Sequence, residues 1–219
     1  MIKKILKYTK NLILLCLGLV GIYLFNLFFM KPYSIDHFLG KELVLDLVDS
    51  PEAMTYIGVF DRFDWLTRHN SNLSIPKKDD RENSIKQYEQ VIKTLYKYDD
   101  SSLSQVQRNT KKIALFDAEN NLKQVKEFPH HDYPLNQIGG IHLNTIEFLS
   151  DMHPIRNESE AEDFIKRANL IKKVYEGVLA DLEDQADAGI FPPEFVYDHV
   201  INQLSEFISY DYNCLFIHI

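Results

Sequence analysis

The feature that most constrains this chain is a run of twenty residues without a charged side chain, at positions 11–30. As an α-helix rising about 1.5 Å per residue, the run would be about 30 Å long, the thickness of a bilayer's hydrocarbon core. Four lysines precede it, Lys31 follows it, and the first acidic residue is Asp36. Because positive flanks stay in the cytoplasm, we expect a cytoplasmic basic segment at 1–10, a transmembrane signal anchor at 11–30 and an extracytoplasmic body at 32–219.

A cleaved signal peptide is the alternative interpretation of this run. Signal peptides usually have a shorter apolar stretch and a small-residue cleavage site, whereas this run ends in Phe28-Phe29-Met30. A lipoprotein needs small residues before its cysteine, but Ile13-Leu14-Leu15 precede Cys16. A buried core helix would not need lysines gathered at one end. We therefore favour an uncleaved, single-pass anchor that contacts the lipid bilayer through residues 11–30.

The charge of the body is strongly acidic. Residues 1–31 contain five lysines and no acid, so all 32 acidic side chains lie in the rest of the chain. Phosphate backbones would repel such a body, so we expect no nucleic-acid partner. Cys16 and Cys214 are too far apart in the predicted topology to pair, and they form neither a disulfide framework nor a thiolate metal cluster.

Helical periodicity dominates the body and predicts an all-α fold, a single transmembrane anchor helix followed by a multi-helix domain. Segments with helical caps or stripes begin near Ser34, Ser50-Pro51, Lys77, Ser102, Asn157 and Pro192-Pro193. The most regular stripe repeats at 4-3-4-3-4 spacing: Phe164, Ala168, Ile171, Tyr175, Val178 and Leu182. Alternating strand patterns are scarce, which allows at most one short strand, near 138–143.

The residues carry no complete catalytic signature. There is no His-Glu-x-x-His, no pair of histidines at i, i+4, no Gly-x-Ser-x-Gly and no glycine-rich phosphate loop. We therefore assign no catalytic residue and no metal ligand to this chain. Ser74-Ile-Pro-Lys77 matches Ser-x-x-Lys, the pattern of a lysine-activated nucleophile, but such a short pattern often arises by chance.

One uncharged stretch, Tyr-Pro-Leu-Asn-Gln-Ile-Gly-Gly-Ile-His-Leu at 133–143, interrupts the helices. Its amides supply donors and acceptors without charge, which suits recognition of a peptide group. Its glycine pair permits close approach of another backbone. The alternative is that the amides satisfy nearby helix ends and that the histidine is a hydrogen-bonded core residue. The candidate substrate-cleft residues are Asn136, Gln137, Gly139, Gly140 and His142.

Three segments of the chain together resemble the bacterial domain of unknown function 885. They are the 133–143 stretch, Ala-Gly-Ile-Phe-Pro-Pro-Glu-Phe-Val at 188–196 and Ser-Pro-Glu-Ala-Met-Thr-Tyr-Ile-Gly-Val-Phe-Asp-Arg-Phe-Asp at 50–64. The likeness covers most of 34–204 in the same order. It implies a large helical protein similar to zinc metallopeptidases, with a cleft between two helical halves and often a secretion signal or an anchor. The family's zinc motif lies in its carboxy-terminal half, and no position here matches a zinc ligand.

The resemblance leads to our main expectation from the sequence. The chain is the amino-terminal part of a zinc-dependent, peptidase-like protein in a bacterial cell membrane, with its body in the periplasm or exterior. It supplies one wall of a peptide cleft, binds no cofactor itself and is inactive alone. The body would pair with a missing carboxy-terminal half or self-associate, an expectation based partly on the apolar end at 212–219. The alternative is a membrane-tethered helical interaction module without catalytic activity.

Overall fold

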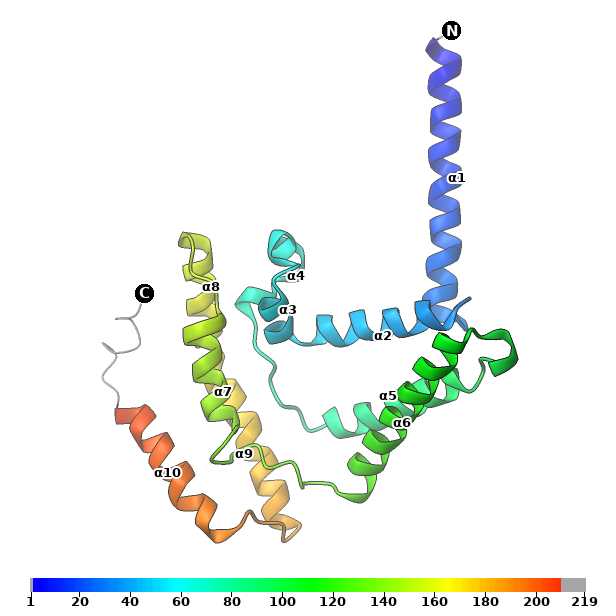
Figure 1. Ribbon diagram of the computed structural model, residues 1–219. Coiled ribbons are helices and arrows are strands. Elements are labelled where there is room, and N and C mark those ends of the chain that lie inside the picture. The colour runs from blue at the N-terminus through cyan, green and yellow to red at the C-terminus, as the bar shows by residue number, and fades with distance from the viewer. Residues whose placement is uncertain (1, 210–219) are drawn as a thin grey trace. The chain divides into compact units, whose positions relative to one another are not determined.

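The computed structural model describes residues 2–209 (Figure 1). Within that range every regular element is a helix and none is a strand, which confirms the predicted all-α fold. The chain divides into two compact units. Unit 1 comprises Met1–Leu45 and Lys86–Leu122, and unit 2 comprises Asp46–Ile85 and Lys123–Ile219.

The first helix, α1, runs over Ile2–Phe29 and is longer than the uncharged run that predicted it. Its segment Lys7–Phe29 is long and apolar enough to cross a membrane, and no other helix among the described residues is. Side chains 7–25 are all exposed. Apolar side chains exposed along a whole helix need another apolar medium. The helix thus fits an anchor, and it also fits a signal sequence.

The end of α1 is joined to the rest of unit 1 by a set of hydrogen bonds that we call the Asn26 clasp. Asn26 is buried, its Nδ2 donates to the Lys31 carbonyl at 3.0 Å, and its Oδ1 accepts from the Tyr33 amide at 3.0 Å. The Tyr98 hydroxyl donates to the Pro32 carbonyl at 2.8 Å. The Lys31 ammonium lies 4.4 Å from the centroid of the Tyr98 ring. The turn after α1 is therefore a fixed joint.

The rest of unit 1 packs parts of three helices around a small core. These elements are α2 (Ile35–Asp49), α5 (Asp80–Leu95), the short η3 (Asp100–Ser102) and α6 (Gln105–Glu127). The core cluster consists of Ile35, Phe38, Leu95, Tyr98 and Leu103. Tyr98 belongs both to this core and to the Asn26 clasp, so the packing of unit 1 and its joint to α1 depend on each other.

Unit 2 contains a series of short helices followed by three longer ones. The short ones are α3 (Pro51–Ile57), η1 (Asp61–Phe63), α4 (Asp64–Thr67), η2 (His69–Ser71), α7 (Ile141–Glu147) and the π-helix η4 (Phe148–Met152). The longer ones are α8 (Glu158–Ala168), α9 (Ile171–Asp187) and α10 (Glu194–Ser209). Segment 58–75 shows no helical periodicity in the sequence, which predicts a packed loop, and it contains the short helices η1, α4 and η2.

Three of the predicted helix starts, at Ser34, Ser50 and Asn157, are confirmed by side-chain caps. Ser50 Oγ accepts from the Ala53 amide at 3.2 Å, and Asn157 Oδ1 accepts from the Glu160 amide at 3.1 Å. Gly189, with φ of +70°, follows α9. The start of α6 differs from the prediction. The reciprocal capping box joins Ser104 and Gln107, two residues beyond the predicted one.

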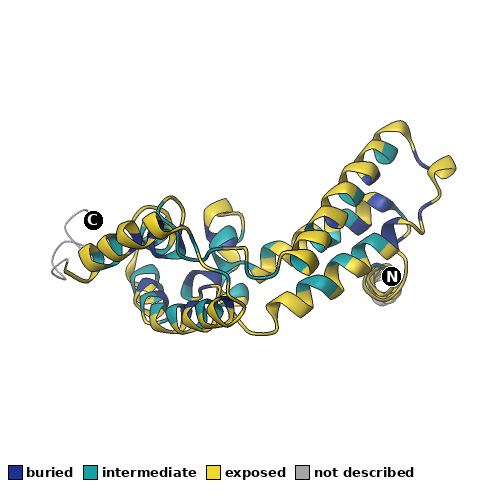
Figure 2. Cartoon of the chain, turned by 90° about the horizontal axis from the view of Figure 1, so that it is seen from below, coloured by how far each residue is buried: buried dark blue, intermediate teal, exposed yellow. Residues whose placement is uncertain are grey.

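Two predictions about helix faces are wrong. The 4-3-4-3-4 stripe does not lie on one helix, because α8 ends at Ala168 and α9 begins at Ile171. There the Leu170 amide donates to the Arg167 carbonyl, three residues earlier, which tightens the last turn of α8. The apolar stripe that follows Ser34 in the sequence (Ile35, Phe38, Leu39, Leu43 and Leu47) predicts one buried face for α2, but Leu43 is 61% exposed. Much of the second half of α2 is exposed (Figure 2).

Candidate functional site

Unit 2 contains a cleft of ≈ 630 Å³ that draws its walls from five segments. These are Lys77–Lys78, the start of α5 at 80–84, the end of α6 at 124–125, the segment 128–134 and α9 residues 181–185. A cavity of this volume lies within the range of about 300–1,000 Å³ that small ligands occupy in proteins. The cleft is therefore large enough for a few residues of an extended peptide.

Specific contacts hold the walls of the cleft together. Gln185 of α9 is buried, and its Nε2 donates to the Asp132 carbonyl at 2.9 Å. Arg81 Nε donates to the Val125 carbonyl at 3.2 Å, which links α5 to the end of α6. A Cβ at Gly177 of α9 would lie 2.6 Å from the carbonyl oxygen of Pro76. Glycine there lets the segment before α5 lie directly against α9.

The walls carry charges of both signs, with acids in the majority. Lys77, Lys78 and Arg81 supply positive charge, and the acids are Asp80, Glu82, Asp132, Asp181 and Asp184. Burial raises the pKa of the Asp181 carboxyl, and the nearby charges of Asp184 and Asp80 raise it further. The lining therefore contains five carboxylates and three lysine or arginine side chains.

The segment 133–143, singled out in the sequence, begins at the wall of the cleft. Asp132 and Pro134 both line it. The predicted residues beyond them form a compact turn, in which Asn136 Oδ1 accepts from the Ile138 and Gly139 amides at 3.1 and 2.8 Å. The Asn136 side chain thus stabilises its own turn. The place where the sequence allowed a strand, 138–143, forms this turn and the start of α7.

The remaining candidates are brought together by Gln203 of α10. His142 is buried, and its Nε2 lies 2.9 Å from Gln203 Oε1. Gln203 Nε2 donates to the Gln137 carbonyl at 3.2 Å. His142 Nδ1 is buried without a hydrogen-bond partner among the described residues. Gly140 is tightly enclosed, because a Cβ there would lie 2.7 Å from His142 Cε1 and from Asn136 backbone atoms.

None of the five candidate residues lines the cleft itself. They lie immediately after its wall in the chain and are tied to α10 through Gln203. Their contact with a substrate stays a prediction. The sequence did not single out the cleft residues of α5 and α9, because charged residues on helices usually form a solvated face and carry no spacing that marks a cleft.

A second polar cluster, also missed in the sequence, surrounds the buried guanidinium of Arg167. Its Nε donates to the Asn72 carbonyl at 2.8 Å, and one terminal nitrogen contacts His153 Nδ1 at 2.7 Å. The other donates to Thr55 Oγ1 at 2.9 Å and to the His69 carbonyl at 2.6 Å. These four partners are neutral, and burial lowers the pKa of Arg167 to about 10. The cation therefore stays charged at neutral pH and fastens α8 to three other segments.

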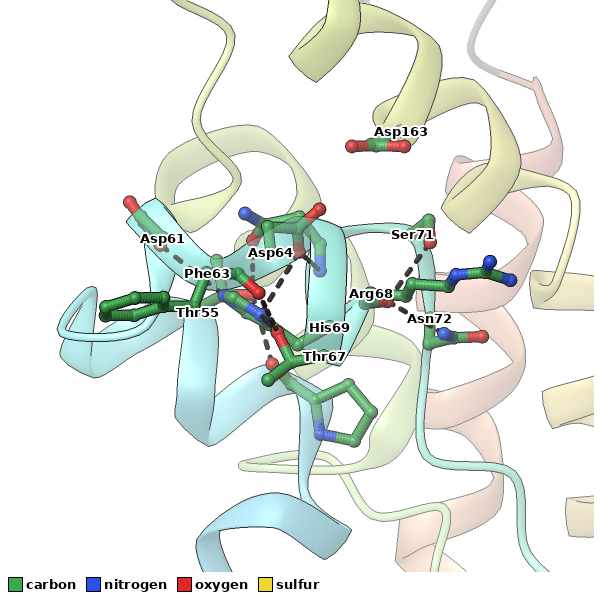
Figure 3. Close-up of polar contacts among 12 residues, drawn as sticks. Thr55, Asp61, Phe63, Asp64, Thr67, Arg68, His69, Ser71, Asn72 and Asp163 are labelled. Carbon is green, nitrogen blue, oxygen red and sulfur yellow. Dashed lines mark hydrogen bonds and ion pairs between the residues drawn. The ribbon is translucent and has the colours of Figure 1, made fainter. Parts of the chain in front are cut away.

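His69 forms the other part of this cluster (Figure 3). Its Nδ1 lies 2.7 Å from Thr67 Oγ1 and 3.1 Å from Asp64 Oδ1, and its Nε2 lies 3.5 Å from Asp61 Oδ1. The ring is almost fully buried. Each of these imidazole contacts joins neighbouring turns of 61–71. We interpret the cluster as a structural one.

The positions of Ser74 and of the metal-binding side-chain types bear on two other kinds of chemistry. Ser74 Oγ donates to Glu52 Oε2 at 2.6 Å, so its hydroxyl is engaged by a carboxylate and not by Lys77. Within residues 2–209 no group of three or more His, Cys, Asp or Glu side chains is placed to hold a metal ion. The described residues thus do not fit the zinc ion that the family resemblance implies.

These features define a helical protein with one apolar amino-terminal helix and a polar cleft in its body. The model of a family described as bacterial protein of unknown function (DUF885) matches residues 51–214, well over half of the chain. The chain therefore belongs to the DUF885 family, as the motifs at 50–64, 133–143 and 188–196 predicted. No curated protein and no solved structure matches it significantly.

Proposed function

We propose that this chain is a membrane-anchored, extracytoplasmic DUF885 protein whose body binds peptides in the unit 2 cleft and so forms one wall of a larger substrate site. The observation that carries the proposal is the position of the uncharged segment 133–143. It starts at the wall of a cleft of ≈ 630 Å³ whose acidic and basic side chains can bind the charged groups of a peptide.

The residues supply binding and orientation in this proposal, and no hydrolytic step is assigned to them. Zinc would polarise a scissile carbonyl and activate water in the peptidase-like reaction that the resemblance implies. The described residues hold no ligand set for that ion. The role of this part of the chain is therefore to position a peptide, with a preference for basic side chains because acids outnumber bases in the cleft.

The test uses the full chain in detergent and three fluorescein-labelled nonapeptides, one rich in lysine, one rich in glutamate and one neutral. Ser84→Tyr places a large side chain in the cleft. Ser205→Tyr is its matched control, because both serines lie on helices and donate to the carbonyl four residues earlier, at 2.9 and 2.7 Å.

We expect the lysine-rich peptide to bind most tightly in fluorescence polarisation titrations. Ser84→Tyr should weaken its binding by about tenfold, equivalent to about 1.4 kcal/mol, and Ser205→Tyr should leave it unchanged. If no peptide binds, or if both variants bind as the unchanged chain does, the cleft is not a peptide site.

A second candidate function, a tethered interaction module, is favoured by an exposed apolar surface on segment 56–66. Its members are Tyr56, Ile57, Val59, Phe63, Trp65 and Leu66, exposed by 47–75%. Surfaces of this kind are typical of protein interfaces. If it is one, the detergent-solubilised chain should sediment as an oligomer that Trp65→Ser with Leu66→Ser dissociates. A monomer with or without these substitutions would leave this candidate without support.

A further inference from the structure

Helix α2 is apolar on both of its sides, which is unusual for a helix at the surface of a protein. Ile35 and Phe38 are buried in the core of unit 1. Leu43, Val44 and Leu45 of the same helix are 61%, 50% and 42% exposed. Apolar side chains that lie together on an exposed helix face are normally covered by another protein or by lipid. The outer side of α2 therefore needs a second apolar medium.

The outer side of α2 faces α1. The His37 ring packs edge-on against the Tyr23 ring of α1, with centroids 5.5 Å apart and planes at 83°. Val44 lies seven residues, or two turns, beyond His37 and so on the same face. The acidic Asp36 lies off this face, where Gln107 of α6 donates to it at 2.7 Å. The face turned toward α1 is thus free of carboxylates near its centre.

The contact with Tyr23 also fixes the depth of α2. Tyr23 lies within the candidate span Lys7–Phe29, six residues before its end. At about 1.5 Å per residue, that places the contact about 9 Å inside the end of the span. The start of α2 thus lies beside the last turns of α1, at the depth where amphipathic helices rest between headgroups and acyl chains.

The direction of α2 agrees with such a position. Figure 1 shows α2 beginning beside the end of α1 and running away from it sideways. The Asn26 clasp fixes the turn between the two helices. A bilayer that contains α1 would therefore run along α2, at least over Ile35–Leu45, which belongs to the same unit as α1.

We propose that α2 is an interfacial helix that lies on the outer leaflet, with the exposed side chains at 43–45 at the boundary between headgroups and acyl chains. The occupant of this face is the lipid bilayer, because the face is continuous with the lipid-facing surface of α1. The inference rests on the membrane anchor of the proposed function. It adds a second, peripheral membrane contact that holds unit 1 against the membrane.

The test places a single tryptophan at chosen depths of the full chain in nanodiscs, with or without brominated lipids that quench tryptophan fluorescence. The natural Trp65 is replaced by phenylalanine in every variant. Val44→Trp reports on α2, and Leu19→Trp reports on the span. Ile113→Trp is the control, since Ile113 is an exposed apolar residue of α6 in the same unit, 69% exposed.

We expect bromolipids to quench Leu19→Trp strongly, Val44→Trp clearly and Ile113→Trp hardly at all. Quenching at position 19 but not at position 44 would overturn the interfacial helix and leave the anchor intact. No quenching at position 19 would remove the anchor, and with it this inference. A concentration-dependent blue shift at position 44 without quenching would show that a second chain, not lipid, covers α2.

Discussion

At the scale of single residues, neighbouring glycines meet very different surroundings. A Cβ at Gly140 would lie 2.7 Å from backbone atoms of Asn136 and from His142 Cε1, whereas a Cβ at Gly139 meets nothing within 4 Å. We expect Gly140→Ala to lower the free energy of unfolding by about 1–3 kcal/mol. Gly139→Ala should stay within about 0.5 kcal/mol of the unchanged chain. Urea denaturation in detergent, followed by circular dichroism, measures both, and equal effects would contradict the close packing at Gly140.

His153 gives the chain a residue-scale dependence on pH. Burial lowers its pKa below the ordinary value of 6.5, and the Arg167 charge acts in the same direction. Its Nδ1 accepts a hydrogen bond from Arg167. A proton on Nδ1 would therefore bring two N–H donors face to face. The pKa of His153 is lower in the folded state than in the unfolded state. Its contribution to the free energy of unfolding is therefore complete above about pH 6.5 and is lost as the pH falls below that value.

The corresponding experiment compares the unchanged chain with His153→Gln, which does not titrate. The free energy of unfolding should fall more steeply with acidification below about pH 6.5 in the unchanged chain than in the variant. Above that pH the difference between the two should be constant. Parallel curves over the whole range would show that His153 does not carry this dependence.

Buried cations are the residues that sequence reasoning predicts least well here. Arg167 finds its partners at Asn72, His69 and Thr55, about a hundred residues away in the chain. Lys111 is buried too, and its ammonium donates to the Tyr98 carbonyl and to Asp100 at 2.6 Å. Helical periodicity predicts that Arg167 and Lys111 face solvent, because it contains no information about hydrogen-bond acceptors on other segments.

At the scale of elements, periodicity and caps located the helices but not always their ends or buried faces. The apolar amino-terminal helix and the caps at Ser50 and Asn157 were predictable because their signals are local. The outer face of α2 was not predictable, since the helix carries apolar residues on more than one side and its buried side is therefore ambiguous in the sequence. The cleft was not predictable either, because it arises only when α5, α6 and α9 approach one another.

The start of α6 offers an element-scale test of cap position. Ser104 Oγ accepts from the Gln107 amide, whereas Ser102 Oγ donates to the Asp99 carbonyl before the helix begins. We expect Ser104→Ala to cost about 0.5–2 kcal/mol and to speed hydrogen exchange in the first turn of α6. Ser102→Ala should leave exchange in that turn unchanged. A larger effect of Ser102→Ala than of Ser104→Ala would place the cap at Ser102, as the sequence pattern predicted.

At the scale of the whole molecule, the lysine asymmetry and α1 together predict the topology. An uncleaved anchor keeps residues 1–10 in the cytoplasm and the body outside. In spheroplasts that express the chain with an amino-terminal tag, added protease should remove the body and leave a tagged, membrane-bound fragment. Without protease, the tagged chain should keep its full mass of 25.7 kDa plus the tag. A soluble, shortened body would instead identify α1 as a cleaved signal.

The Asn26 clasp has a mechanical consequence for an anchored chain. A flexible tether would let a body swivel freely above its membrane helix, but here the joint is closed by hydrogen bonds from both sides of the turn. A bilayer thinner than α1 is long would make the helix lean to keep its apolar length in the hydrocarbon. The rest of unit 1 would have to lean with it by the same angle, so local membrane thickness would set how this part of the chain is presented to its surroundings.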